Sequence, residues 1–150
     1  MTLSSRIAAF LTLLITALAM RPAASQGQPV KGHLVIIGGG ERTDEIMTRF
    51  IDLAGGPENA RIVVLPMASS EPDTRGMLQA EEFRSRGIRN VESLLFSREE
   101  ASGQDVIHKF DGVTGVFFGG GDQVRITRVL VGTPVEQKLK ELYRNGCVIG

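Results

Sequence analysis

The sequence predicts an α/β domain built on a mostly parallel β-sheet, and three observations lead to this prediction. Short apolar runs recur along the chain and stop at glycine, proline or polar residues. Amphipathic helical patterns lie between these runs, so each strand–helix unit takes about 30 residues, as in a right-handed parallel sheet. The chain has 150 residues, 42% of them hydrophobic, which is enough for one domain with a buried core.

The predicted strands are apolar on both faces, which is typical of a parallel sheet covered by helices on two sides. Glycine triplets follow the first and fourth runs, and Pro66 follows the second. The third run is the weakest. The five predicted strands are 33–37, 61–65, 90–95, 113–118 and one that begins at 147–149.

The first two helices are predicted from apolar residues spaced three and four apart. Thr43 is the expected N-cap of the first helix, and Gly55 stands just past its end. Its apolar stripe consists of Ile46, Phe50, Leu53 and Ala54. Gly87 closes the second helix, whose pattern consists of Met77, Ala80, Phe83 and Arg84.

Two further helices are predicted in the last third of the chain. A short one follows Asp122, with apolar residues at Val124, Ile126, Val129 and Leu130. The last begins at Thr133–Pro134, where Thr133 and Glu136 match a capping box, and ends at Asn145–Gly146. Its buried stripe is predicted to be Val135, Leu139, Leu142 and Tyr143. Residues 97–109 predict only an irregular turn with a short helix.

Residues 1–25 have the pattern of a secretory signal peptide. The segment lacks acidic residues, and Arg6 precedes an apolar stretch at 7–20 that is followed by small residues. Because about 20 apolar residues are needed to span a bilayer, we expect no stable membrane anchor. Cleavage is expected near Ala24 or Ser25, with residues 17–19 as a competing site. Residues 26–150 are then the N-terminal part of an α/β domain in the periplasm or outside the cell.

Composition excludes several classes of function. The 17 basic and 17 acidic residues give a net charge of zero, which argues against a dedicated nucleic-acid-binding protein. Cys147 is the single cysteine, so it forms no internal disulfide, and we interpret it as a small buried hydrophobic residue. His33 and His108 show no metal-ligand spacing with it. No metal and no cofactor are predicted.

Two glycine triplets, at 38–40 and 119–121, follow predicted strands, where ligands of open α/β sheets bind. The first lacks the third glycine of a dinucleotide-binding fingerprint, and no acidic residue follows the second strand, so this interpretation is disfavoured. The second runs into a helix start, where backbone N–H groups favour a carboxylate or an oxyanion. The candidate oxyanion or substrate-binding residues are therefore Gly120, Gly121, Asp122 and Gln123. In the alternative interpretation, the glycines form a tight turn, Asp122 is an N-cap and Gln123 is solvated.

Four segments resemble cyanophycinase, a family of serine peptidases that also includes peptidase E, an aspartyl dipeptidase. The segments are 32–41, 62–70, 117–123 and 133–150, and Gly120–Gln123 is the most specific. The resemblance implies a three-layer α/β/α fold related to class I glutamine amidotransferases and of flavodoxin-like type. It also implies hydrolysis of cyanophycin, a poly-aspartate carrying arginines on its β-carboxylates, to β-aspartyl-arginine dipeptides.

The resemblance also implies roles for individual residues. Gln123 corresponds to a substrate-contacting residue, and Gly120 and Gly121 lie on the oxyanion side. Asp122 stands where related sequences often have asparagine. The family's nucleophilic serine follows the strand that begins at Cys147, and its catalytic histidine lies further along; neither His33 nor His108 matches that histidine. The chain is therefore expected to be incomplete at its C-terminus, without a catalytic residue, and inactive by itself.

Two other hypotheses remain open from the sequence. In the first, the chain is a non-catalytic exported domain that binds anionic peptides. In the second, it belongs to a peptidase that acts on other aspartyl peptides. A peptide polymer is the expected partner, and the resemblance also implies that the full-length protein forms a homodimer.

Overall fold

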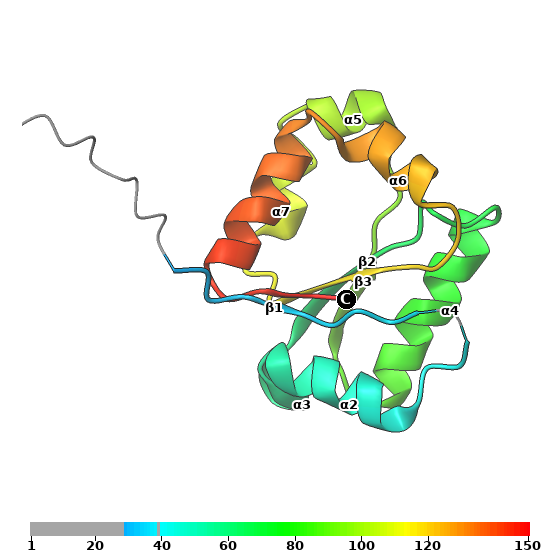
Figure 1. Ribbon diagram of the computed structural model, residues 1–150, viewed down its shortest axis with the longest axis vertical. Helices are drawn as coiled ribbons and strands as arrows, with labels where there is room; N and C mark the ends of the chain where they lie inside the picture. Colours follow the sequence, from blue (N-terminus) through cyan, green and yellow to red (C-terminus); the bar gives the residue numbers. More distant parts are fainter. Residues whose placement is uncertain (1–28, 39) are drawn as a thin grey trace, which may run out of the picture.

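A computed structural model describes residues 29–38 and 40–150 as an α/β/α sandwich around a parallel sheet (Figure 1). The sheet has five strands in the order β1-β5-β4-β2-β3, and all neighbouring pairs are parallel. The strands are β1 (His33–Leu34), β2 (Arg61–Leu65), β3 (Asn90–Ser93), β4 (Gly115–Phe118) and β5 (Val148–Ile149). The predicted three-layer, parallel α/β fold is confirmed.

The strands lie where the apolar runs predict them, but four are shorter than the runs. Only β2 spans its whole run. Isolated backbone hydrogen bonds extend two other strands: Val35 N–H donates to the Ile149 carbonyl at 2.8 Å, and Leu94 N–H donates to the Val64 carbonyl at 2.9 Å. Beyond the two residues of β1, Val35 and Ile37 still pack against the core, whereas Ile36 is 89% exposed.

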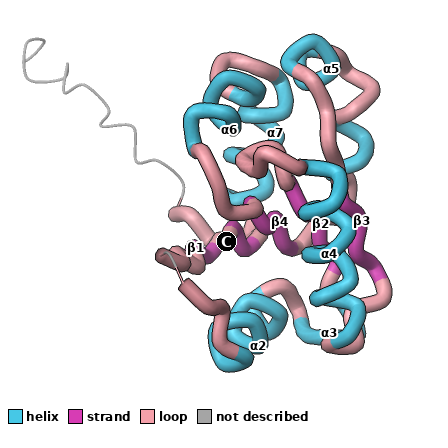
Figure 2. The backbone as a smooth tube through the Cα atoms, turned by 90° about the vertical axis from the view of Figure 1, so that its right-hand side faces the viewer, coloured by secondary structure: helices cyan, strands magenta, loops and turns pink. Residues whose placement is uncertain are grey.

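Helices cover both faces of the sheet (Figure 2). One face carries α2, α3 and α4, and the other carries α5, the 3₁₀ helix η1, α6 and α7. Their bounds are α2 (Asp44–Leu53), α3 (Gly56–Asn59), α4 (Pro72–Ser85), α5 (Arg98–Ser102), η1 (Ile107–Phe110), α6 (Gln123–Leu130) and α7 (Pro134–Arg144). The predicted turn with a short helix at 97–109 consists of α5 and η1, and the short α3 was not predicted.

Side-chain caps start three of the predicted helices where the sequence places them. The Thr43 hydroxyl accepts from Ile46 N–H at 3.4 Å, and the Asp122 carboxylate accepts from Val124 N–H at 2.8 Å. Thr133 caps α7, but the predicted capping box is wrong in one bond, because Glu136 accepts from Gly132 N–H instead of from the N-cap backbone. A complete capping box starts α5 instead, between Ser97 and Glu100.

Helix α4 begins earlier than its predicted apolar pattern, and two of the four residues that it turns toward the sheet differ from the predicted ones. Met77 is 65% exposed, whereas the face against the sheet consists of Gly76, Gln79, Ala80 and Phe83. Gly76 lies so close to the sheet that a Cβ there would be 3.0 Å from the Pro66 side chain. A glycine and a glutamine in the buried stripe conceal the true period, because the apolar pattern counts neither.

Two apolar clusters fill the spaces between the sheet and its helices. The cluster toward α2 and α4 contains three aromatic rings: the Phe50 and Phe117 centroids are 5.4 Å apart, and those of Phe83 and Phe117 are 5.3 Å apart. Both pairs meet edge to face, an arrangement that adds to the free energy gained from burial. This aromatic cluster joins both helices to the centre of the sheet.

The predicted signal peptide, residues 1–25, lies outside the described residues. Within residues 29–38 and 40–150, no helix has the length and the apolar character needed to cross a bilayer.

Replacement of Phe83 by alanine is expected to lower the free energy of unfolding by about 3–5 kcal/mol, because it leaves a cavity beside two other rings. Met77→Ala on the same helix removes an exposed side chain and is the matched control, with an expected change within about 0.5 kcal/mol. Chemical denaturation of the gene product measures both. Equal losses in the two variants would contradict the described burial.

Candidate active site

The carboxyl ends of β1, β4 and β5 meet where the chain connections leave the sheet in opposite directions. The segment after β1 leads to α2 on one face, and the segment after β4 leads to α6 on the other. β5 lies between these two strands. Such a switch point opens a crevice at the end of an α/β sheet and is where ligands of these folds bind.

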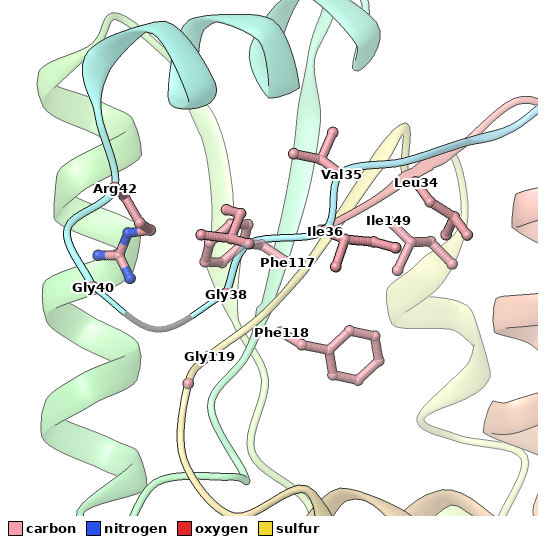
Figure 3. Close-up of a pocket in the computed structure, with 13 residues that line it drawn as sticks. Leu34, Val35, Ile36, Gly38, Gly40, Arg42, Phe117, Phe118, Gly119 and Ile149 are labelled. Carbon is pink, nitrogen blue, oxygen red and sulfur yellow. The ribbon is translucent and has the colours of Figure 1, made fainter.

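A cavity of about 510 Å³ lies at this switch point, and we call it the glycine cavity (Figure 3). Backbone from both glycine triplets and from the end of β5 borders it. Its lining consists of Leu34, Val35, Ile36, Ile37, Gly38, Gly40, Arg42, Phe117, Phe118, Gly119, Gly120, Ile149 and Gly150. The lining is mainly apolar, so backbone groups supply much of its polarity.

Backbone pairing aligns the end of β5 with the second glycine triplet. Phe118 N–H donates to the Gly150 carbonyl at 2.8 Å, and Gly150 N–H donates to the Val116 carbonyl at 2.9 Å. Gly150 also lies on the aromatic cluster, since a Cβ there would be 2.8 Å from Phe50 Cε2. The triplet therefore begins directly beside the point that β5 reaches at Gly150.

The turn after β4 is held against the segment that follows β2. Gly119 N–H donates to the Leu65 carbonyl at 3.0 Å, and Asp122 N–H donates to the Ala68 carbonyl at 2.9 Å. Gly121 has a φ of +142°, and a Cβ there would lie 2.2 Å from the Ala68 oxygen, so only glycine fits without a shift of the backbone. In the described part of the chain, neither Gly120 nor Gly121 N–H has a backbone acceptor.

The four predicted site residues have different surroundings. Gly120 lines the glycine cavity and is exposed, and Gly121 forms the turn next to it. The Asp122 carboxylate caps α6, as the alternative interpretation expects, so one of its oxygens is occupied by Val124 N–H. Gln123 is exposed in the first turn of α6. Their roles in binding or catalysis stay predictions.

Arg42 lines the glycine cavity and was missed by the sequence analysis. Its guanidinium forms an ion pair with the Glu82 carboxylate of α4, and its Cζ lies 5.7 Å from the centre of the Phe117 ring. The one feature of the sequence that could have placed Arg42 at the cavity is its position two residues after the first glycine triplet. That signal was weak, because the partner Glu82 lies 40 positions away and belongs to another helix.

The other reactive side chains lie away from the glycine cavity. His108 is exposed and contacts Asp111, with 3.3 Å between Nδ1 and Oδ2. The Cys147 side chain is buried, and burial raises the pKa of its thiol to about 11, so it stays protonated at neutral pH. Among the described residues, no three His, Cys, Asp or Glu side chains group as metal ligands.

Comparison with known proteins gives matches over most of the chain. The sequence profile of peptidase family S51 matches residues 34–150. The cyanophycinase of Synechococcus elongatus is 37% identical over 125 residues, which are 80% of this chain and 38% of the relative. The cyanophycinase of Trichormus variabilis is 34% identical over 79% of this chain and 41% of its own length.

A solved peptidase from an acI-B1 actinobacterium has a similar fold. It aligns with a TM-score of 0.65 at 20% identity, over 83% of this chain and 54% of that structure. The chain thus spans about two fifths of the curated relatives named above and about half of the structural neighbour.

Fold and cavity together define a doubly wound α/β protein with a cavity at the switch point of its parallel sheet, where ligands of such folds bind. The profile match over residues 34–150 makes the assignment specific. The chain belongs to peptidase family S51.

Replacement of Gly121 by alanine is expected to lower the free energy of unfolding by about 1–3 kcal/mol, because its φ is left-handed and the Ala68 carbonyl occupies the Cβ position. The matched control is Gly120→Ala, whose Cβ would have no atom within 4 Å. Thermal unfolding of the gene product compares the two variants. Identical melting temperatures would show that the turn is not built as described.

Proposed function

We propose that this chain is part of an exported cyanophycinase, a serine-type S51 peptidase that hydrolyses cyanophycin to β-aspartyl-arginine dipeptides. The observation that carries the proposal is the similarity to two curated cyanophycinases at 34–37% identity over four fifths of the chain. The position of the second glycine triplet beside the end of β5 supports it, because that is where the family resemblance puts the nucleophile.

The proposed mechanism takes its serine and histidine from the family resemblance and its oxyanion donor from that turn. In the proposed enzyme, a serine encoded after Gly150 attacks the peptide carbonyl and transfers its proton to a histidine, which also lies outside residues 1–150. The N–H of Gly120, exposed and without a protein acceptor in the described chain, donates to the oxyanion of the tetrahedral intermediate. The histidine then protonates the leaving amine, and water hydrolyses the acyl-enzyme. Residues 1–150 alone have no peptidase activity in this proposal.

Gln123 is proposed to contact the substrate from the first turn of α6. Its amide both donates and accepts hydrogen bonds, which suits a peptide backbone or a carboxylate. Replacement by alanine in the gene product is expected to lower kcat/KM for cyanophycin by about tenfold, the effect of losing one or two hydrogen bonds. Gln137→Ala is the matched control, because Gln137 is an exposed glutamine near the start of α7 and does not line the glycine cavity.

Steady-state kinetics with cyanophycin and with other α- and β-aspartyl peptides measure the effect. A wild-type protein that turns over only other aspartyl peptides would replace the proposed substrate and keep the mechanism. A protein that binds these peptides without cleaving them would support a non-catalytic binding domain. Unchanged kinetics in Gln123→Ala would remove its proposed role.

Export is proposed from the residue pattern of 1–25. Expression in a Gram-negative host is expected to give a mature protein in the periplasm or medium that begins near Ser25 or Gln26, because a signal peptidase cleaves after small residues. N-terminal sequencing and cell fractionation check this outcome. An uncleaved protein with Met1 in the cytoplasm would reject the signal peptide, and an uncleaved protein in the membrane fraction would indicate an anchor.

A further inference from the structure

The charge of the glycine cavity comes from one side chain. Among the described residues that line it, Arg42 is the only charged one, and the others are glycines or apolar residues. Figure 3 shows Arg42 beside Gly40, at the opposite end of the cavity from Leu34 and Ile149. A guanidinium at the wall of a cavity can donate hydrogen bonds to an anionic group of a ligand.

A neighbouring carboxylate positions Arg42 but is shared with a second arginine. Glu82 contacts the Arg42 guanidinium through Oε2 and lies 3.5 Å from Arg86 Nη1 through Oε1. The side chains of Arg42 and Glu82 are both mostly buried, with 28% and 23% of their surface exposed. Arg86 also pairs with the Asp44 carboxylate at 2.8 Å, so the two guanidinium groups are matched by two carboxylates. Arg42 is the member of this group that lines the cavity.

The guanidinium has hydrogen-bonding capacity left for a ligand. Arginine has five N–H donors, and the contact with Glu82 involves Nη2. The Nε atom is buried and has no acceptor in the described part of the chain. Contact with the Phe117 ring restricts the plane of the group, so less side-chain entropy is lost when a planar ligand binds. A carboxylate matches two parallel N–H donors of such a group.

We propose that Arg42 is a specificity-determining residue that binds a carboxylate of the substrate in the glycine cavity. This inference rests on the proposed function, since cyanophycin supplies the ligand. Two carboxylates of the chain end have the required chemistry. One is the α-carboxylate of the terminal aspartate, and the other belongs to its arginine, which stays free when arginine is linked through its amino group.

Binding measured by calorimetry on the gene product tests the inference without turnover. The ligands are β-aspartyl-arginine, its argininamide, and its aspartyl α-amide, so that each carboxylate is blocked in turn. In the wild-type protein, blocking the carboxylate that Arg42 contacts is expected to weaken binding about tenfold, whereas blocking the other has a smaller effect. The sensitive ligand identifies which carboxylate Arg42 binds.

Arg42→Gln is expected to bind the free dipeptide about tenfold more weakly than wild type and to lose the difference between the free and blocked ligands. Arg42→Lys keeps the charge without the planar fork and is expected to lie between the two. Arg86→Gln is the matched control, because Arg86 contacts the same Glu82 but does not line the cavity. It is expected to keep the wild-type ratio between ligands.

Circular dichroism verifies that each variant is folded, and if Arg42→Gln fails to fold, Arg42→Lys and the blocked ligands still decide the outcome. The inference is overturned if the wild-type protein binds all three ligands equally or binds none, or if Arg42→Gln retains the wild-type ratio. Cyanophycin turnover is measured separately. A protein that selects the free carboxylate through Arg42 but does not cleave the polymer would reject the proposed function and keep this inference.

Discussion

The pairing of β4 with β5 over three phenylalanines is the contact on which the rest of the site depends. The bond from Phe118 N–H to the Gly150 carbonyl puts the second glycine triplet beside the end of β5. Gly150 packs so closely on Phe50 that a Cβ there would lie 2.8 Å from its ring. Because protein cores are close-packed, a larger residue at this position would push β5 away from the aromatic cluster and from the triplet.

Two loops that border the cavity, one after β1 and one after β4, are held by contacts with other elements. The segment after β1 carries Arg42, which an ion pair and a ring contact connect to α4 and β4. The turn after β4 is bonded through Asp122 N–H to the segment after β2. Arg125 strengthens this second attachment by donating to the Ser69 carbonyl at 3.0 Å. The backbone amides are thereby fixed before any ligand binds, which is the condition for electrostatic stabilisation of an oxyanion.

The sequence predicts the layers well because burial on both faces leaves a clear pattern. β2 is buried at four of its five positions, and its predicted bounds are the observed ones. The caps at Thr43 and Asp122 were predicted because a cap is a local contact within three residues. Prediction fails where contacts are distant in sequence: Gln79 lies buried in the stripe of α4, and Arg42 depends on Glu82 of another element. Position in the cavity is a property of the assembled sheet, which no local pattern contains.

The candidate site separates two tasks that the predicted cluster Gly120–Gln123 combined. The Asp122 carboxylate caps α6, so this part of the cluster provides backbone donors and the Gln123 amide. Among the described residues that line the cavity, the charged side chain is Arg42, which comes from the loop after β1. In the proposed enzyme, the oxyanion is therefore stabilised by one loop and the substrate carboxylate is recognised by another. In that enzyme, specificity can change through residue 42 while the amides at Gly120 stay in place, because the backbone hydrogen bonds of the turn after β4 run to the end of β2 and the segment after it, and not to Arg42.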